Sequence, residues 1–126
     1  MSYAMTMYLR AKQSESFAHV IPVLERNSTV TDFPIEKPYV SFGIESEEGE
    51  FLLGNDTPVV REVMTVTVSV SDESSGEYCR ALAKEICMYV VGLDEEKRII
   101  SISSGGCRHE PALGAYTIKM SFGINT

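Results

Sequence analysis

The chain has 126 residues, with 11 lysine and arginine residues against 18 aspartate and glutamate residues, which gives a formal net charge of −7. This length is typical of one compact domain, and a composition of 44% apolar and 23% charged residues excludes a disordered chain. A surface of this sign repels phosphate backbones, so the composition disfavours a protein that reads nucleic acid.

Residues 1–12 are predicted to form a mobile arm or an added strand, because their apolar residues alternate only weakly. Ser14 can cap a helix that follows, and Pro22 would kink or shorten that helix. The apolar residues of this second segment have helical spacing: Phe17, Val20, Ile21 and Leu24.

Strict alternation of apolar and hydroxyl residues predicts a strand over residues 63–70, with one face on a core. Similar patterns predict strands over residues 38–44, 98–103 and 115–124, and a short return strand over residues 51–53. The acidic segment from Glu45 to Glu50 is expected to form a hairpin tip in which Gly49 supplies the turn.

Helical spacing of apolar residues predicts a helix over residues 75–92, which Ser74 and Glu77 would cap and Gly92 would end. Together these elements predict a single α+β domain over residues 1–126. We expect a mainly antiparallel (mixed) sheet with the helices packed on one face.

Residues 107–110 bring nucleophile, base and acid side chains together. Cys107 and His109 would point to the same side of a strand, so a Cys–His pair is geometrically possible. Nothing in the sequence marks the thiol as activated, which favours a surface loop without a catalytic role. Gly105 and Gly106 precede no helix and no G-K-[ST] motif, so they indicate a strand connection rather than a phosphate loop.

A metal site would need three or four ligands from a small set, Cys79, Cys87, Cys107, His19 and His109. No C-x₂-C or H-x₃-H spacing occurs among them, so we predict neither a metal nor a cofactor. Cys79 and Cys87 would lie about 12 Å apart on one helix, too far for a disulfide. No apolar run approaches the roughly 18–20 residues of a membrane span, and we expect a soluble intracellular protein with reduced thiols.

Five acidic residues lie within twelve positions and have no basic residue among them: Glu45, Glu47, Glu48, Glu50 and Asp56. They are consistent with a solvated hairpin tip, or with an interaction or ion-repelling surface. Lys97, Arg98 and Arg108 bracket the strand predicted over residues 98–103, and they could meet the acidic tip of a neighbouring copy. Such a head-to-tail contact between unlike surfaces can close into a ring.

The order and rhythm of the elements over residues 36–126 resemble those of small tail-terminator and tail-completion proteins of long-tailed phages and prophages. The segments that carry the resemblance are MTVTVSVS (64–71), YCRALAK (78–84), RIISISSGGC (98–107) and YTIKMSFGI (116–124). None of them is a diagnostic motif by itself.

The resemblance implies a protein without enzymatic activity that forms a ring, usually of six copies. The ring would cap the finished tail tube, contact tail-tube and head-completion proteins, and let DNA pass without being read. An acidic lumen suits that passage because repulsion lets a polyanion slide. The implied location is the cytoplasm of a bacterial host and then the virion, with no membrane partner.

Two other classes of function stay open. A small cytosolic enzyme or ligand-binding domain would use a pocket between the helix over residues 75–92 and the sheet, with Tyr78, Tyr89, Cys107 or His109 at its mouth. A tail-assembly chaperone-like adaptor would be a stable dimer that binds an extended partner segment at a sheet edge.

Overall fold

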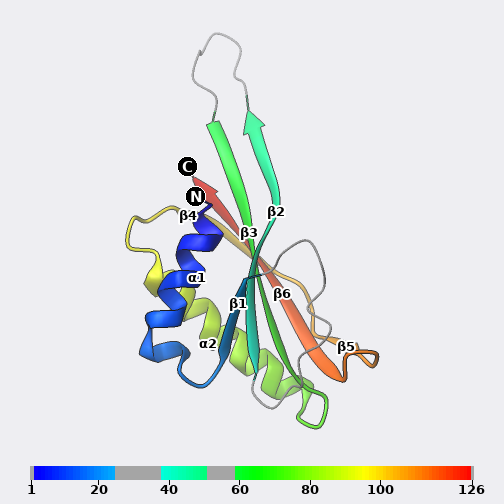
Figure 1. The fold of residues 1–126 in the computed structure, drawn as a ribbon. Helices are drawn as coiled ribbons and strands as arrows, with labels where there is room; N and C mark the ends of the chain where they lie inside the picture. The colour runs from blue at the N-terminus through cyan, green and yellow to red at the C-terminus, as the bar shows by residue number, and fades with distance from the viewer. Residues whose placement is uncertain (1, 25–37, 51–58, 126) are drawn as a thin grey trace.

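The fold is one mixed β-sheet with two α-helices on one of its faces (Figure 1). This computed structural model describes residues 2–24, 38–50 and 59–125, without the side chains of residues 46–50 and 59–61. The α+β class predicted from the sequence is confirmed.

The sheet has the strand order β1-β2-β3-β6-β4, and β5 pairs with β6 outside this path. β1 runs parallel to β2, and every other pair is antiparallel. The elements are α1 (Tyr3–Gln13), a 3₁₀ turn η1 (Glu15–Phe17), β1 (Ile21–Leu24), β2 (Tyr39–Glu50), β3 (Val59–Ser71), α2 (Gly76–Leu93), β4 (Ile99–Ser104), β5 (Arg108–Glu110) and β6 (Ala115–Asn125).

β3 lies at the centre of the sheet, and the alternation predicted for it separates two faces. The core face carries Met64, Val66, Val68 and Val70, all of them 0% exposed. Val66 lies between Phe42 of β2 and Met120 of β6, so apolar residues of three strands meet under the helices. Threonine and serine residues occupy the other face, opposite Thr117, Lys119 and Ser121 of β6.

α2 covers the core face through an apolar stripe, as its spacing predicts. The N-cap is Ser75, whose hydroxyl accepts from the N–H of Tyr78, so the expected cap at Ser74 was one residue early. Gly92 does not end the helix, which continues to Leu93 and stops at Asp94. The buried residues of the stripe are Cys79, Leu82, Ala83, Ile86 and Val90.

The expectation of a mobile arm or added strand at residues 1–12 was wrong, because this segment forms α1 and packs on the sheet. Its buried residues are Tyr3, Ala4, Met7 and Ala11, which follow helical spacing. Three of these four are small or aromatic rather than aliphatic, so a search for branched apolar residues does not detect the stripe.

The helix expected after Ser14 was also wrong. Ser14 does cap a turn, but that turn is the short η1, and the chain then enters β1 parallel to β2. Pro22 lies inside β1 and explains the change, since a proline disrupts a helix interior yet is tolerated in an edge strand.

The segment from Glu45 to Glu50 is not a hairpin tip, because β2 continues to Glu50 and pairs with β3 as far as Val59. The register shifts between Ile44 and Ser46, where the strand bulges. The return strand expected over residues 51–53 lies outside the described residues, as does Asp56.

α1 is attached to the sheet by a buried carboxylate of β3. Glu62 is 5% exposed, and its two oxygens accept from the backbone N–H groups of Tyr3 at 3.0 Å and Ala4 at 2.9 Å. These donors belong to the first turn of α1, where N–H groups have no partner within the helix and the helix dipole favours a negative charge. Ser2 caps the same turn by accepting from the N–H of Met5 at 3.1 Å.

We expect Glu62→Gln to lower the free energy of unfolding by about 1–3 kcal/mol, because the amide removes the charge and one of the two acceptors. Urea unfolding monitored by circular dichroism measures the loss. The matched control is Glu73→Gln at an exposed position, which should change stability by less than about 0.5 kcal/mol. Equal stabilities of the two variants would contradict this role of Glu62.

A second carboxylate, Asp94, joins the end of α2 to the start of β4. It is 4% exposed and accepts from the backbone N–H groups of Arg98 at 3.0 Å and Ile99 at 2.9 Å. Burial alone would raise the pKa of Asp94, but these hydrogen bonds and one from the Tyr3 hydroxyl outweigh it and lower the pKa.

The Tyr3 hydroxyl also lies 2.8 Å from Glu96 Oε2, and Arg10 forms an ion pair with the same carboxylate. Hydrogen bonds from Arg10 and then from Tyr3 lower the pKa of Glu96 to about 2. α1 is therefore held at its first turn by β3 and along its length by the segment that leads into β4.

Because the pKa of Asp94 is lowered in the folded state, its contribution to stability is complete above its unfolded value of about 4 and is lost as the pH falls below it. We expect Asp94→Asn to lower the free energy of unfolding by about 1–3 kcal/mol at pH 7. The difference from the wild type should shrink as the pH falls below about 4.

Chemical denaturation at neutral and acidic pH measures both effects, and the exposed neighbour variant Glu95→Gln is the control. A difference between wild type and Asp94→Asn that stays the same at both pH values would show that the charge of Asp94 contributes nothing.

Candidate functional site

The distal ends of β2 and β3 form an arm that extends past both helices (Figure 1). We define the acidic arm as residues 45–50 of β2 with residues 59–63 of β3. The two strands pair from Ser46–Val63 to Glu50–Val59, Glu45 lies at the bulge, and residues 61–63 also pair with β6. β1 ends opposite Phe42, so among the described residues the backbone of β2 from Gly43 onward pairs with β3 alone. As far as the structure describes the chain, the other edge of this stretch of β2 is therefore open.

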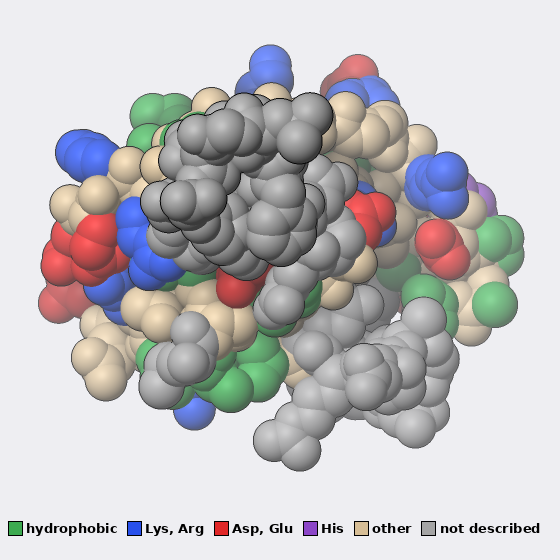
Figure 2. Space-filling model, turned by 90° about the horizontal axis from the view of Figure 1, so that it is seen from above, with side chains coloured by type: hydrophobic (Ala, Val, Ile, Leu, Met, Phe, Trp, Pro, Cys, Tyr) green, Lys and Arg blue, Asp and Glu red, His purple; other side chains and the backbone are tan. Residues whose placement is uncertain are grey.

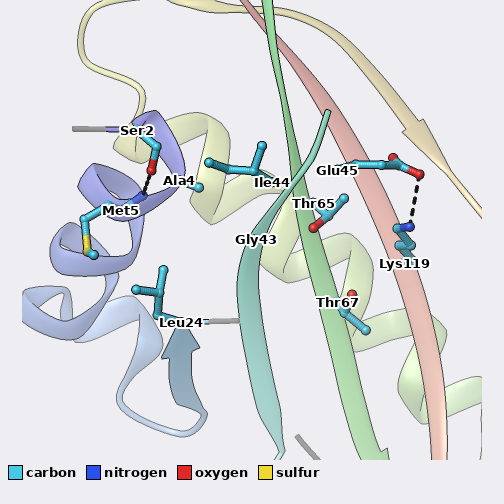
Figure 3. A pocket seen from close by; sticks show the side chains of 10 residues that line it. All are labelled: Ser2, Ala4, Met5, Leu24, Gly43, Ile44, Glu45, Thr65, Thr67 and Lys119. Atoms are coloured by element: carbon cyan, nitrogen blue, oxygen red, sulfur yellow. Dashed lines mark hydrogen bonds and ion pairs between the residues drawn. The ribbon is translucent and has the colours of Figure 1, made fainter. Parts of the chain in front are cut away.

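The sequence makes this arm strongly acidic, with Glu45, Glu47, Glu48 and Glu50 on β2. Glu45 forms an ion pair with Lys119 of β6 at 3.2 Å and accepts from Ser121 at 3.4 Å (Figure 3). Glu45 therefore has a partner within the chain. The structure does not describe the side chains of the other three.

A surface hollow of about 400 Å³ lies beside the base of the arm, on both sides of Gly43 (Figure 3). Ile44 points toward α1 and is 45% exposed, whereas Glu45 and Lys119 lie on the other side of β3. The lining is mainly apolar on the side of α1 and polar on the side of Lys119.

A second hollow, of about 290 Å³, lies between α2 and the end of β4. We name it the α2–β4 groove; its side chains include Arg80, Ala83, Lys84, Cys87, Ile102, Cys107, Ile118 and Met120. It continues along β4 into a hollow lined by Val91, Lys97 and Ile100, which shares Ile102. The groove is therefore largely apolar along its length, with three basic side chains, Arg80, Lys84 and Lys97, and the buried carboxylate of Asp94 in its lining.

β4 forms the edge of the sheet on this side and has an apolar surface. Ile100 and Ile102 are 47% and 46% exposed, and on α2 Val91 and Met88 are 41% and 73% exposed. Among the described residues no strand pairs with the outer edge of β4. An edge strand flanked by exposed aliphatic side chains is a typical site for association with another chain.

The three basic residues predicted to make contacts have different environments. Lys97 is exposed in the turn before β4, with a φ of 57°. Arg98 lies over the ring of Tyr3 at 4.5 Å and donates to the carbonyl of Asn125 at 3.1 Å, so it stabilises the fold. Arg108 is exposed on β5 and shares a hollow of about 460 Å³ with Glu45.

The surface loop expected at residues 107–110 is instead the strand β5 over its last three residues, closed onto β6 by a turn in which Gly114 has a φ of 61°. His109 stacks on Tyr116 at 4.9 Å between ring centres, and its Nε2 lies 3.1 Å from Asp72 Oδ2. No hydrogen bond joins His109 to Cys107 in the part of the chain that the structure describes. The Cys–His pair is therefore not formed.

Cys107 lies instead beside the first turn of α2, where a Cβ added at Gly76 would be 3.5 Å from its sulfur. Burial, and then interaction with the Cys107 thiol, raise the pKa of Cys79 to about 12. Burial also raises the pKa of Cys87. No group of three or more His, Cys, Asp or Glu side chains among the described residues is placed to hold a metal ion.

The pocket expected between this helix and the sheet corresponds to the α2–β4 groove, but only Cys107 of the four predicted residues lines it. Tyr89 packs on Phe17 at 5.9 Å and donates to Glu85 at 2.7 Å, and Tyr78 is exposed. The apolar edge of β4 was missed because Ile100 and Ile102 look like core residues in the sequence.

We expect Cys79 to react with iodoacetamide at least ~100-fold more slowly in the native protein than in the unfolded chain, because its thiol is buried and scarcely ionised. Peptide mapping by mass spectrometry measures each cysteine separately. Cys107 is the internal comparison. A Cys107 that reacts much faster than a free thiol would favour the enzyme alternative, and an ordinary rate would count against it.

Comparison of the sequence with models of known protein families and with curated proteins finds no match. None of the helices in the described residues is both long and apolar enough to cross a membrane. Figure 2 shows acidic and basic side chains interspersed on the face seen from above. Among the described residues, the acidic arm and the α2–β4 groove each combine charged residues with a strand edge that lacks a partner.

Proposed function

We propose that this chain is a structural component of a phage or prophage tail, a tail-terminator-like protein that forms a ring of usually six copies. The observation that supports this proposal most directly is a pair of unlike open edges on one sheet. One edge is the distal half of β2, which is acidic, and the other is β4, which is apolar with basic residues beside it.

Unlike edges favour association between different surfaces of neighbouring copies. A contact of this kind leaves one edge of each copy free for the next copy, and it forms a ring when the rotation between copies closes. β4 ends the strand order, and beyond the end of β1 the distal half of β2 is the opposite edge of the described sheet. One copy can therefore use both edges at once.

The charge of the chain suits a ring through which DNA passes. A net charge of −7 per copy gives a six-copy ring a strongly negative field, which repels a polyanion and prevents it from adhering to the wall. The ring would cap the tail tube and contact head-completion proteins, first in the host cytoplasm and then in the virion, and no enzymatic step is part of this role.

The α2–β4 groove also supports a second candidate function, a small ligand-binding or enzyme domain. Its volume of about 290 Å³ is near the lower end of ligand pockets, and Cys107 lies in its lining. An adaptor that binds an extended segment would use the same edge, β4, and predicts a stable dimer.

We expect light scattering to give a mass near six copies at high protein concentration. This mass should fall at high salt, because charged surfaces would contribute to the contacts. Negative-stain electron microscopy of the same sample should show rings with an open centre.

A stable dimer that does not respond to salt would favour the adaptor. A strict monomer at every concentration would count against self-assembled rings and give the ligand-binding candidate equal weight.

A further inference from the structure

We propose that the acidic arm of one copy docks along the α2–β4 groove of the next copy, so that its β2 edge lies against the open edge of β4. This inference rests on the proposed function, since it names the surfaces by which the copies of a ring meet. It is carried by three features of the described residues: two open backbone edges, an uncovered apolar strip and complementary charge.

The two backbone edges are similar in length, and neither has a second strand beside it among the described residues. β4 has six residues, Ile99–Ser104, that pair with β6 on one side only in the described part of the chain. Within the same described part, β2 has no strand on its other side over residues 43–50. Each edge carries N–H and C=O groups without a strand partner, and pairing them would extend the sheet from one copy to the next.

The apolar strip along β4 needs a cover that the described residues do not supply. Ile100 and Ile102 are about half exposed, and Val91 of α2 lies beside them in the same hollow. Ile44, 45% exposed at the base of the arm, is an apolar counterpart on the other surface. Contact between these aliphatic side chains would bury area that each monomer leaves in water.

Charge selects the acidic arm as the occupant. Arg80 and Lys84 line the groove, and Lys97 lines its extension along β4. None of these three forms an ion pair with a described acidic residue. The β2 strand of the arm has three glutamates beyond Glu45, which Lys119 pairs, whereas the β3 strand carries Arg61 and the buried Glu62. The arm is therefore acidic where the groove is basic.

The test is a reciprocal charge swap. The arm variant is Glu47→Lys with Glu48→Lys, and the groove variant is Lys84→Glu with Lys97→Glu. The control is Glu73→Lys with Glu15→Lys, which changes charge as much as the arm variant does but at exposed positions that line neither surface. Circular dichroism checks that each variant folds, and light scattering at low salt measures its mass.

We expect the arm variant and the groove variant each to raise the dissociation constant of the oligomer on the order of 10-fold or more, because like charges would then face each other. The control variant should assemble like the wild type. An equimolar mixture of the arm and groove variants should regain the mass, since reversed arms fit reversed grooves and wild-type arms fit wild-type grooves. Misfolded variants would not regain it.

A wild-type oligomer that both variants leave unchanged would overturn the docking and leave the ring standing. The same conclusion follows if each variant is monomeric and the mixture stays monomeric. A wild-type chain that is monomeric at every concentration would overturn the docking and self-assembled rings together, so the two failures are distinguishable.

Discussion

The structure depends on the alternation of apolar and hydroxyl side chains along β3, which makes only one face of this strand apolar. Four of its side chains are completely buried on one face, and hydroxyl side chains occupy the other. Because a strand turns successive side chains to opposite faces, the register of β2 and β6 against β3 places their apolar residues on the same side. Both helices must cover that side, and neither is available to cover the sheet edges.

The buried carboxylates Glu62 and Asp94 make this arrangement specific. A purely apolar interface would let α1 slide or rotate on the sheet, whereas Glu62 accepts from two particular N–H groups of its first turn. Asp94 connects α1, through Tyr3, to the backbone that leads into β4. The position of the edge strand is therefore coupled to that of the N-terminal helix.

The surfaces left by this packing explain why the proposed function is one of assembly. β2 and β3 are the two longest strands, and their ends extend beyond the helices, with acidic residues on β2. At the opposite edge of the sheet, β4 exposes aliphatic side chains. Monomeric proteins usually protect such edges with charge, proline or a covering element. Here the β2 edge carries acidic residues, whereas β4 itself is apolar and the basic residues lie beside it in the groove.

Periodicity in the sequence determined β3, β6, the core of α2 and the α+β class. A regular pattern with one apolar face fits only one type of secondary structure, a strand for period 2 and a helix for period 3.6. It also identified the acidic segment and the basic residues near β4. Only the tertiary structure showed that residues 3–13 are a helix, whose stripe is too small in area to stand out, and that Pro22 lies in a parallel edge strand. The tertiary structure also decided that Glu45 and Arg98 have partners within the chain and that Ile100 and Ile102 are exposed. Exposure depends on which elements end up beside a strand, and that information is not local.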